Sequence, residues 1–369
     1  MIGMFKSLPS VMLLVGEDLP AYLMTIGVLD YLKRKEYFRP IVVMVRDLPR
    51  AKVNLPALQE YAFLEKHALR DIVMPFCNVH RQEFNVKATG AVTPEQMALR
   101  YRSLGCNVLR ANNINSSEFH SIVHGLDRLK AVISLRCTQI LRESLLRLLN
   151  EKSAKVLNIH TSLLPEYRGV LTCGRRIYDI RRGVTGNDDS VGLTLHLIET
   201  AEIDAGNILN IGAVPYQGAS VFGTLLGLVP TGVSMLTHQL DALSRGGLLV
   251  GVQQDLKQAH YYTYPTEVEL KEMQDIGVVL ATPDDLSRAV LGAFGNVTDG
   301  AGSSLLNHMQ EGIRNHYFCA GQAVPEMADL SSEFVGVSGS RRHPCKKDRD
   351  PKTLIPPVMP GAARAEAAI

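Results

Sequence analysis

Short apolar runs alternate with amphipathic stretches along most of the chain. Apolar runs bounded by glycine or polar residues predict buried strands, and apolar residues three and four positions apart predict helices. Strands are expected over residues 11–15, 41–45, 106–109, 129–135, 156–160, 191–197 and 208–214. Helices are expected over 20–34, 55–67, 93–104, 117–126, 142–150, 267–276 and 283–293, with one or two more over 220–243, interrupted near Pro230.

The repeated order of strand, helix and strand defines the expected fold class. At this spacing it predicts right-handed βαβ units and a parallel sheet, hence an α/β protein. Thr93 can cap the helix that follows it, Pro94 suits the first helical position, and Gln96 completes a capping box.

Composition narrows the class of protein. Of 369 residues, 46% are hydrophobic and 21% charged, as in an ordinary globular protein. The formal net charge of +2 gives no overall attraction to nucleic acid or anionic lipid. No apolar run reaches the roughly 18 residues of a membrane helix, and residues 1–15 lack the cleavage site of a signal peptide. The six cysteines show no zinc-type spacing, and a chain of this length does not need disulfides for stability. A reduced, cytoplasmic protein is therefore expected.

The character of the sequence changes after Gly246. Residues 1–246 are expected to form the main domain and 247–338 a small C-terminal appendage. Residues 339–369 combine a basic run with a Pro- and Ala-rich end. They cannot bury enough apolar area to order themselves, which predicts a disordered tail.

The segment 156–169 carries the first candidate chemistry. Asn158 and His160 are two residues apart on a predicted strand, so they face the same side. Pro165 and Gly169 then indicate a loop. Because ligands of open α/β sheets bind beyond the carboxyl ends of strands, this strand end is a candidate active site. The alternative is that both side chains only satisfy local hydrogen bonds.

A second segment, 191–209, alternates like a strand and then turns at Asp204 and Gly206. Together the two segments resemble the folate-dependent formyltransferases, which share an Asn-x-His strand end, a Ser-Leu-Leu-Pro-x-Tyr-Arg-Gly loop and an Ile-Asp-x-Gly turn. The resemblance is sharp over 130–210 and extends in outline over 10–245. It implies a Rossmann-like three-layer α/β/α fold with a mostly parallel sheet, and transfer of a formyl group from N10-formyltetrahydrofolate to an amine.

Formyl transfer to an amine needs a stabilised oxyanion, an acceptor for the amine's proton and a donor for the leaving nitrogen. The resemblance implies that Asn158 and protonated His160 donate to the oxyanion. It implies that Asp204 keeps the imidazole charged and accepts the amine's proton, directly or through a water. This assignment requires the fold to bring two neighbouring strand ends together.

The resemblance also implies two sets of binding residues. The cofactor set is Ser134, Leu135, Arg136, Ile140, Leu141 and Ile203, with the backbone after the 129–135 strand pairing with the pterin edge. One more core strand and turn is the alternative. The acceptor set is Ser162, Tyr167 and Arg168; Arg168 either meets an anionic group of the acceptor or braces its own loop.

Three further features bear on the site. His196 lies on a strand beside it and is interpreted as a satisfied structural histidine, since no ligand spacing supports a metal. Many family members carry a tryptophan in the helix behind the loop, whereas this chain has none, which leaves the shape of the acceptor pocket open. The Tyr- and Pro-containing segment 261–266 either packs on the surface, which is favoured, or closes over the acceptor site.

Two alternatives to a transferase are open. One is a hydrolase that releases formate from the same cofactor, although the family's hydrolases carry a regulatory domain ahead of the core. The other is a non-catalytic binding module, disfavoured because Asn158, His160 and Asp204 are all present. The expected partner is a small-molecule amine. A tRNA is not favoured, because residues 247–369 lack the strand-rich basic domain of methionyl-tRNA formyltransferases. No membrane partner is expected, and a homo-oligomer is left open.

Overall fold

The computed structural model describes residues 8–46, 55–67, 94–282, 284, 285, 307 and 311. Its strands are β1 Ser10–Val15, β2 Arg39–Val45, β3 Asn107–Ala111, β4 Leu129–Leu135, β5 Lys155–His160, β6 Tyr167–Gly169, β7 Ser190–Leu197, β8 Ile208–Pro215 and β9 His260–Tyr262. Its helices are α1 Leu19–Lys35, α2 Pro56–Lys66, α5 Pro94–Ser103, α6 Ser117–His124, α7 Glu143–Glu151, α8 Thr172–Arg182, α9 Val221–Ser244 and α10 Glu267–Asp275.

The main sheet has seven strands in the order β3-β2-β1-β4-β5-β7-β8. The pairs from β3 to β5 are parallel, whereas β5–β7 and β7–β8 are antiparallel. The strand order reverses between β1 and β4, which is the usual ligand-binding position of such sheets. A second, two-stranded parallel sheet joins β6 to β9.

Apolar side chains of the central strands alternate between cores on the two faces of the sheet. In β1, Val11, Leu13 and Val15 lie in one core with residues of α1 and α9, while Met12 and Leu14 lie in the other with residues of α6 and α7. This two-residue period is that of a strand buried on both faces. The fold is therefore the expected Rossmann-like α/β/α arrangement with a mostly parallel sheet.

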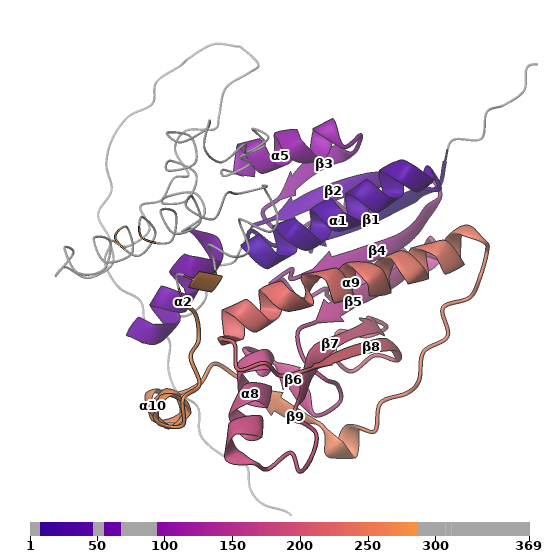
Figure 1. Cartoon of the computed structure of the whole chain (residues 1–369). Coiled ribbons are helices and arrows are strands. Elements are labelled where there is room, and N and C mark those ends of the chain that lie inside the picture. Colours follow the sequence, from indigo (N-terminus) through magenta and orange to yellow (C-terminus); the bar gives the residue numbers. More distant parts are fainter. Residues whose placement is uncertain are drawn as a thin grey trace, which may run out of the picture. The chain divides into compact units, whose positions relative to one another are not determined.

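Local sequence explains where α1 starts and how closely it packs. The Asp18 side chain accepts a hydrogen bond from the Ala21 N–H (2.9 Å), which caps the first turn. Gly27 of α1 faces Val233, and Gly232 of α9 faces Met24, with no room for a Cβ at either glycine. These two glycines let α1 and α9 lie side by side on one face of the sheet (Figure 1).

Residues 220–243 form one helix and not two. The helix α9 runs through Pro230 without a break. An interior proline costs about 3 kcal/mol, and the buried face of α9 against α1 and β7 offsets that cost. By length and composition α9 is also compatible with a membrane span, with a mean hydropathy of 1.3. Nearly half of that stretch is buried within the fold, as in a core helix.

The other elements agree with the sequence prediction to within a few residues. The helix expected at 93–104 is α5, and Gly105 follows it with a φ of +85°. The cap Thr93, most of the helix expected at 283–293 and the tail at 339–369 lie outside the described residues. Residues 1–320 and 321–369 form separate units, and the helices and strands given above all belong to the first. Boundaries at 246 and 338 stay predictions.

Candidate functional site

The strand β5 holds the Asn-x-His motif between β4 and β7. Its register with the antiparallel β7 places Asn158 opposite His196 and His160 opposite Thr194. Asn158 and His160 share one face of β5, as their spacing predicts. Asn158 is half-buried and His160 is buried, so the amide is the more accessible of the two groups.

Both ring nitrogens of His160 face hydrogen-bond acceptors. Nδ1 lies 3.4 Å from Oδ2 of Asp204. Nε2 lies 2.5 Å from the carbonyl oxygen of Tyr167 and 3.3 Å from Oγ1 of Thr172. A neutral imidazole could donate to only one side, so this arrangement is best satisfied by the protonated ring, with N–H groups directed at Asp204 and Tyr167.

The loop that carries Asp204 follows a path that the sequence did not predict. Because β7 is antiparallel to β5, the loop after β7 starts beside the amino end of β5, where Ile198 N–H donates to the Val156 carbonyl (2.8 Å). The loop then folds back, so that the Asp204 carboxylate reaches His160. The expected meeting of two neighbouring strand ends is thus replaced by a loop lying over the strand.

The surroundings of Asp204 favour the carboxylate. Burial opposes its ionisation, but the charge and hydrogen bonding of His160 hold the pKa of Asp204 well below its usual range. Oδ2 also accepts a hydrogen bond from the Gly169 N–H (3.1 Å). Asp204 has a φ of +52°, a left-handed conformation that aspartate tolerates better than most residues.

His196 holds the Asn158 amide. Its Nδ1 lies 2.9 Å from the Leu197 carbonyl oxygen, and its Nε2 lies 3.1 Å from Nδ2 of Asn158. The neutral tautomer with hydrogen on Nδ1 satisfies both contacts and fixes the amide nitrogen toward the ring. Oδ1 of Asp204 is 3.6 Å from the same Nε2. His196 is thus a satisfied histidine, as expected, but one that contacts two motif residues.

Two glycines of the motifs are required by close backbone approaches. A Cβ on Gly206 would collide with the Leu197 carbonyl oxygen. A Cβ on Gly169, whose φ is +103°, would collide with the Tyr262 carbonyl oxygen. These contacts keep the Asp204 loop and the loop after His160 packed on their neighbours.

Arg168 braces the Asp204 loop in this structure. Its Nε and Nη2 both donate to the Ile203 carbonyl oxygen, and Nη2 also pairs with Glu202 (2.9 Å). Of the two sequence-based interpretations, these contacts favour bracing. A contact between Arg168 and an anionic acceptor stays a prediction.

We therefore expect Arg168→Ala to lower kcat about 10-fold with little change in the KM for the acceptor, because it loosens the loop that carries Asp204. Steady-state kinetics check this, with Arg147→Ala as a control at an exposed position of α7. A raised KM with an unchanged kcat would instead indicate that Arg168 binds the acceptor.

The side chains of Ser162 and Tyr167 bond to the protein itself. Ser162 is buried and donates to the Thr172 carbonyl oxygen (3.4 Å). The Tyr167 hydroxyl donates to Oδ2 of Asp179 (2.9 Å), and its ring stacks on Tyr262. Both residues shape the loop after β5. A direct contact with an acceptor stays a prediction for each.

Most side chains of the six residues expected to bind the cofactor are buried or bonded elsewhere, which leaves mainly their backbone groups for binding. Ser134, Leu135 and Leu141 are buried, whereas Ile140 is about half exposed and Ile203 partly so. Arg136 binds elsewhere: its guanidinium pairs with Asp18 (2.9 Å) and with Glu65, at the point where the strand order reverses. Cofactor binding by these six residues stays a prediction.

The loop after β4 is held in place by two amide side chains. Gln139 donates to the carbonyl oxygens of Arg46 (2.8 Å) and Asn112 (2.9 Å) and accepts from the Ile114 N–H (3.0 Å). Asn115 donates to the Ile140 carbonyl oxygen (2.9 Å) and accepts from the Arg142 N–H (2.8 Å). The backbone of this loop is therefore fixed without a ligand.

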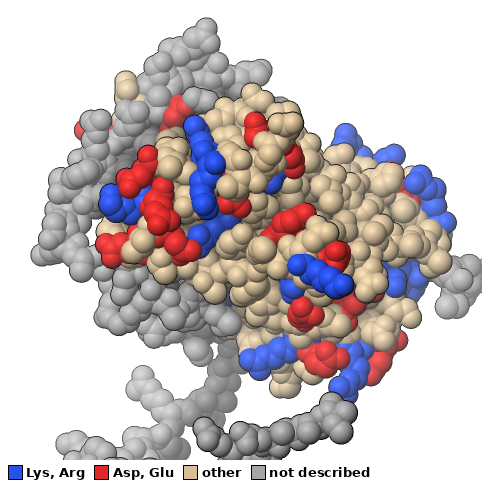
Figure 2. Space-filling view, turned by 90° about the horizontal axis from the view of Figure 1, so that it is seen from below, with Lys and Arg blue, Asp and Glu red and all other residues tan. Residues whose placement is uncertain are grey.

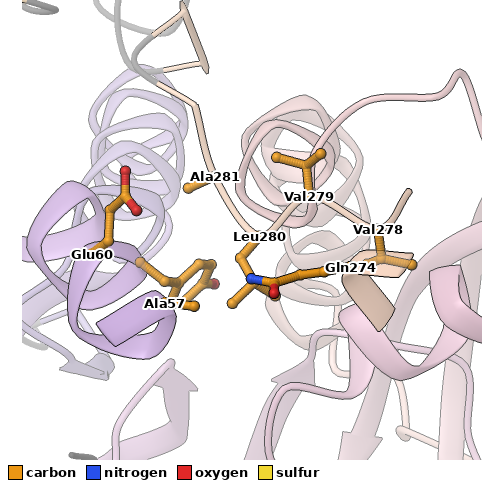
Figure 3. A pocket seen from close by; sticks show the side chains of 8 residues that line it. Ala57, Glu60, Gln274, Val278, Val279, Leu280 and Ala281 are labelled. Carbon is orange, nitrogen blue, oxygen red and sulfur yellow. The ribbon is translucent and has the colours of Figure 1, made fainter. Parts of the chain in front are cut away.

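A cavity of about 210 Å³ lies away from these motifs. It is lined from α2 by Ala57, Glu60 and Tyr61, and from the opposite side by Gln274 and residues 278–281 (Figure 3). Its lining contains none of the motif residues. Among the described residues no group of three or more His, Cys, Asp or Glu could hold a metal ion.

The sequence reasoning gave no role to Gln254. Its Nε2 donates to the carbonyl oxygens of Asp204 (3.0 Å) and Gly206 (2.6 Å). The Tyr- and Pro-containing segment 261–266 begins in β9, which pairs with β6, so Tyr261 and Tyr262 lie beside Arg168 and Gly169.

Comparisons with known proteins agree with the motifs. Residues 54–217 match the formyl transferase family model. Methionyl-tRNA formyltransferase of Natranaerobius thermophilus is 25% identical over 169 residues, which cover 46% of this chain and 50% of that protein. The enzyme of the same name from Nitrobacter winogradskyi is 30% identical over 116 residues, which cover 31% of this chain and 34% of that protein. The chain thus spans half or less of the length of these two relatives.

A solved structure is similar in outline. An N-formyltransferase from Helicobacter canadensis, in complex with folinic acid and dTDP-3-aminofucose, has a TM-score of 0.44 and 13% identity, covering 72% of this chain and 79% of that one. The family match includes both motif segments, with Asn158, His160 and Asp204. Over residues 54–217 the chain is therefore similar to the formyl transferase family.

Proposed function

We propose that this chain transfers a formyl group from N10-formyltetrahydrofolate to an amine of a small-molecule acceptor. The observation that carries the proposal is the convergence of Asn158, His160 and Asp204. A strand and a loop more than forty residues apart along the chain place an amide, a protonated imidazole and a carboxylate in one contact network. Acyl transfer to an amine requires these three kinds of group.

Each residue takes one part of the reaction. When bound, the cofactor supplies the activated formyl group. The Asn158 amide, oriented by His196, donates to the oxygen on which negative charge develops, and the His160 cation beside it stabilises the same charge. The Asp204 carboxylate, which faces the His160 ring, accepts the amine's proton, directly or through a water, and returns a proton to the nitrogen that leaves. The depressed pKa of Asp204 keeps this group ionised at neutral pH.

The backbone of the loop after β4 is suited to binding a folate. The edge of a pterin ring needs fixed backbone donors and acceptors, and side chains of Gln139 and Asn115 hold this loop rigidly. The loop follows the carboxyl end of β4, next to the motif strand β5. Its position relative to Asn158 and His160 supports pterin binding there, and no metal is needed.

Charge supports a small acceptor. Nucleic-acid binding proteins present a continuous basic surface. On the face shown in Figure 2, Lys and Arg alternate with Asp and Glu, and the chain carries a net charge of only +2. The curated relatives nevertheless bear the name methionyl-tRNA formyltransferase, so methionyl-tRNA is the acceptor to be tested against small amines. We place the enzyme in the reducing cytoplasm, since the described Cys106, Cys137 and Cys173 are free thiols.

The direct test is turnover of N10-formyltetrahydrofolate by the purified chain. Release of tetrahydrofolate is followed with a panel of amines, including amino sugars linked to nucleotides, amino acids and methionyl-tRNA. An amine-dependent rate with a formylated product seen by mass spectrometry is the expected result. A rate that needs no amine would indicate the hydrolase, and folate binding without turnover would indicate a binding module.

Asn158→Ala should lower kcat about 10²-fold, the scale of losing one oxyanion donor. The KM for the cofactor should change little, because the amide acts on charge that develops only in the transition state. Steady-state kinetics of the variant check this, with Asn150→Ala at an exposed position of α7 as control. A kcat equal to that of the wild type would remove Asn158 from the mechanism.

A further inference from the structure

After α9 the chain returns to two loops of the candidate site, the loop after β5 and the loop after β7 that carries Asp204. Val252 forms an antiparallel bridge with Ile208, where the Asp204 loop enters β8. Farther on, the strand β9 pairs with β6, matching His260 with Tyr167 and Tyr262 with Gly169. Residues 252–262 lie beyond the part of the chain that matches the family model, which ends at 217. They nevertheless contact both loops of the site.

Gln254 makes the closest of these contacts. It is 6% exposed, and its Nε2 donates to the carbonyl oxygens of Asp204 (3.0 Å) and Gly206 (2.6 Å). The orientation of the amide is unambiguous, because the reverse orientation would place its oxygen against two carbonyl oxygens. Its buried Oε1 has no hydrogen-bond partner among the residues that the structure describes. The side chain thus donates to the two carbonyl oxygens while its own oxygen accepts from none of the described residues. The two carbonyls therefore determine where this amide lies.

The two loops are joined through Asp204 itself. The Asp204 carboxylate accepts from the Gly169 N–H, and the Tyr262 carbonyl oxygen accepts from the Val170 N–H (2.9 Å). Gln254 therefore fixes the backbone on one side of the carboxylate, while β9 fixes the backbone that the carboxylate contacts on the other side.

We infer that Gln254 is a positioning residue, which holds the Asp204 backbone so that the carboxylate faces His160. This inference rests on the proposed function for its catalytic consequence. The left-handed φ of Asp204 directs its carbonyl, with that of Gly206, toward one donor. Without the donor, two partly buried carbonyls lose this partner and the turn relaxes. A displacement of about 1 Å at a reacting group can lower a rate about 10²-fold.

The test compares Gln254→Met, which keeps the length of the side chain but cannot donate, with Gln258→Met as the matched control. Gln258 is exposed, and its side chain donates to Asp255 (3.1 Å). We expect Gln254→Met to lower kcat between about 10-fold and 10²-fold with the KM for the cofactor unchanged. Gln258→Met should behave like the wild type.

A second measurement does not depend on activity. The Gly169 amide, bonded to the Asp204 carboxylate, should exchange with deuterium about 10-fold faster in Gln254→Met, while amides of β1 and β4 exchange at the wild-type rate. General destabilisation would accelerate exchange throughout the sheet. All variants are compared at a temperature at which circular dichroism shows them folded. Gln254→Glu, which also removes the donor at neutral pH, serves if the methionine variant does not fold.

The outcomes separate the two proposals. Faster exchange at Gly169 with a lower kcat supports the inference. Wild-type exchange at Gly169 overturns it, and so does faster exchange spread evenly over the sheet. If the wild type shows no turnover with any amine, the proposed function fails, and the exchange measurement alone still decides whether Gln254 positions Asp204.

Discussion

Asp204→Asn is expected to lower kcat on the order of 10³-fold while the protein stays folded. Asparagine keeps the size of the side chain and an oxygen that can accept from the Gly169 N–H. It removes the negative charge that faces His160 at 3.4 Å and the base that accepts the amine's proton. Binding of a folate analogue should be retained. Steady-state kinetics and titration calorimetry measure the two effects.

The control is Asp275→Asn, at an exposed carboxylate of α10 that pairs with Lys271 (3.3 Å). It should leave kcat unchanged. Turnover of Asp204→Asn close to that of the wild type would exclude the role of Asp204 as charge partner and base. Loss of folding in that variant would show that the carboxylate is needed for structure, and the kinetic comparison would then use Asp204→Ser.

The low pKa of Asp204 also predicts how its contribution to stability depends on pH. A carboxylate whose pKa is lower in the folded than in the unfolded chain stabilises the fold above its unfolded pKa of about 4. That contribution is lost as the pH falls toward the folded pKa. The difference in free energy of unfolding between wild type and Asp204→Asn should therefore narrow as the pH falls below about 4.

His160→Ala is the second change with a large expected effect. It removes the cation beside the oxyanion and leaves the buried Asp204 carboxylate without its main partner. We expect kcat to fall on the order of 10³-fold, with a smaller loss of stability than a buried unpaired charge alone would cause, because the Gly169 N–H still donates to the carboxylate.

Kinetics and thermal unfolding of His160→Ala are compared with those of His238→Ala, at an exposed position of α9. The control should match the wild type in both measurements. An unchanged kcat in His160→Ala would contradict the proposed mechanism. If kcat falls and the variant Asn158→Ala has no effect, charge stabilisation by His160 alone would explain the reaction.

Local sequence was sufficient for most of the fold because the elements follow from short-range patterns. The mainly apolar β1 and β4 are strands buried on both faces, and α1 begins at a capping aspartate. Pro230 misled the prediction, since packing of α9 on α1 outweighs the cost of one interior proline. The motifs at Asn158, His160 and Asp204 likewise needed only their own residues to be found.

The sequence by itself thus predicted the strands of the main sheet, most helices, the similarity to formyltransferases and the three candidate side chains, since each is encoded within a few neighbouring residues. Only the tertiary structure decided how they meet. The antiparallel pairing of β5 with β7 sets His196 against Asn158, and the loop that folds back brings Asp204 to His160. Arg168 is turned to Ile203, and Gln254 returns from fifty residues away to hold the Asp204 turn. Such contacts depend on chain reversal and packing over long separations, which no local pattern specifies.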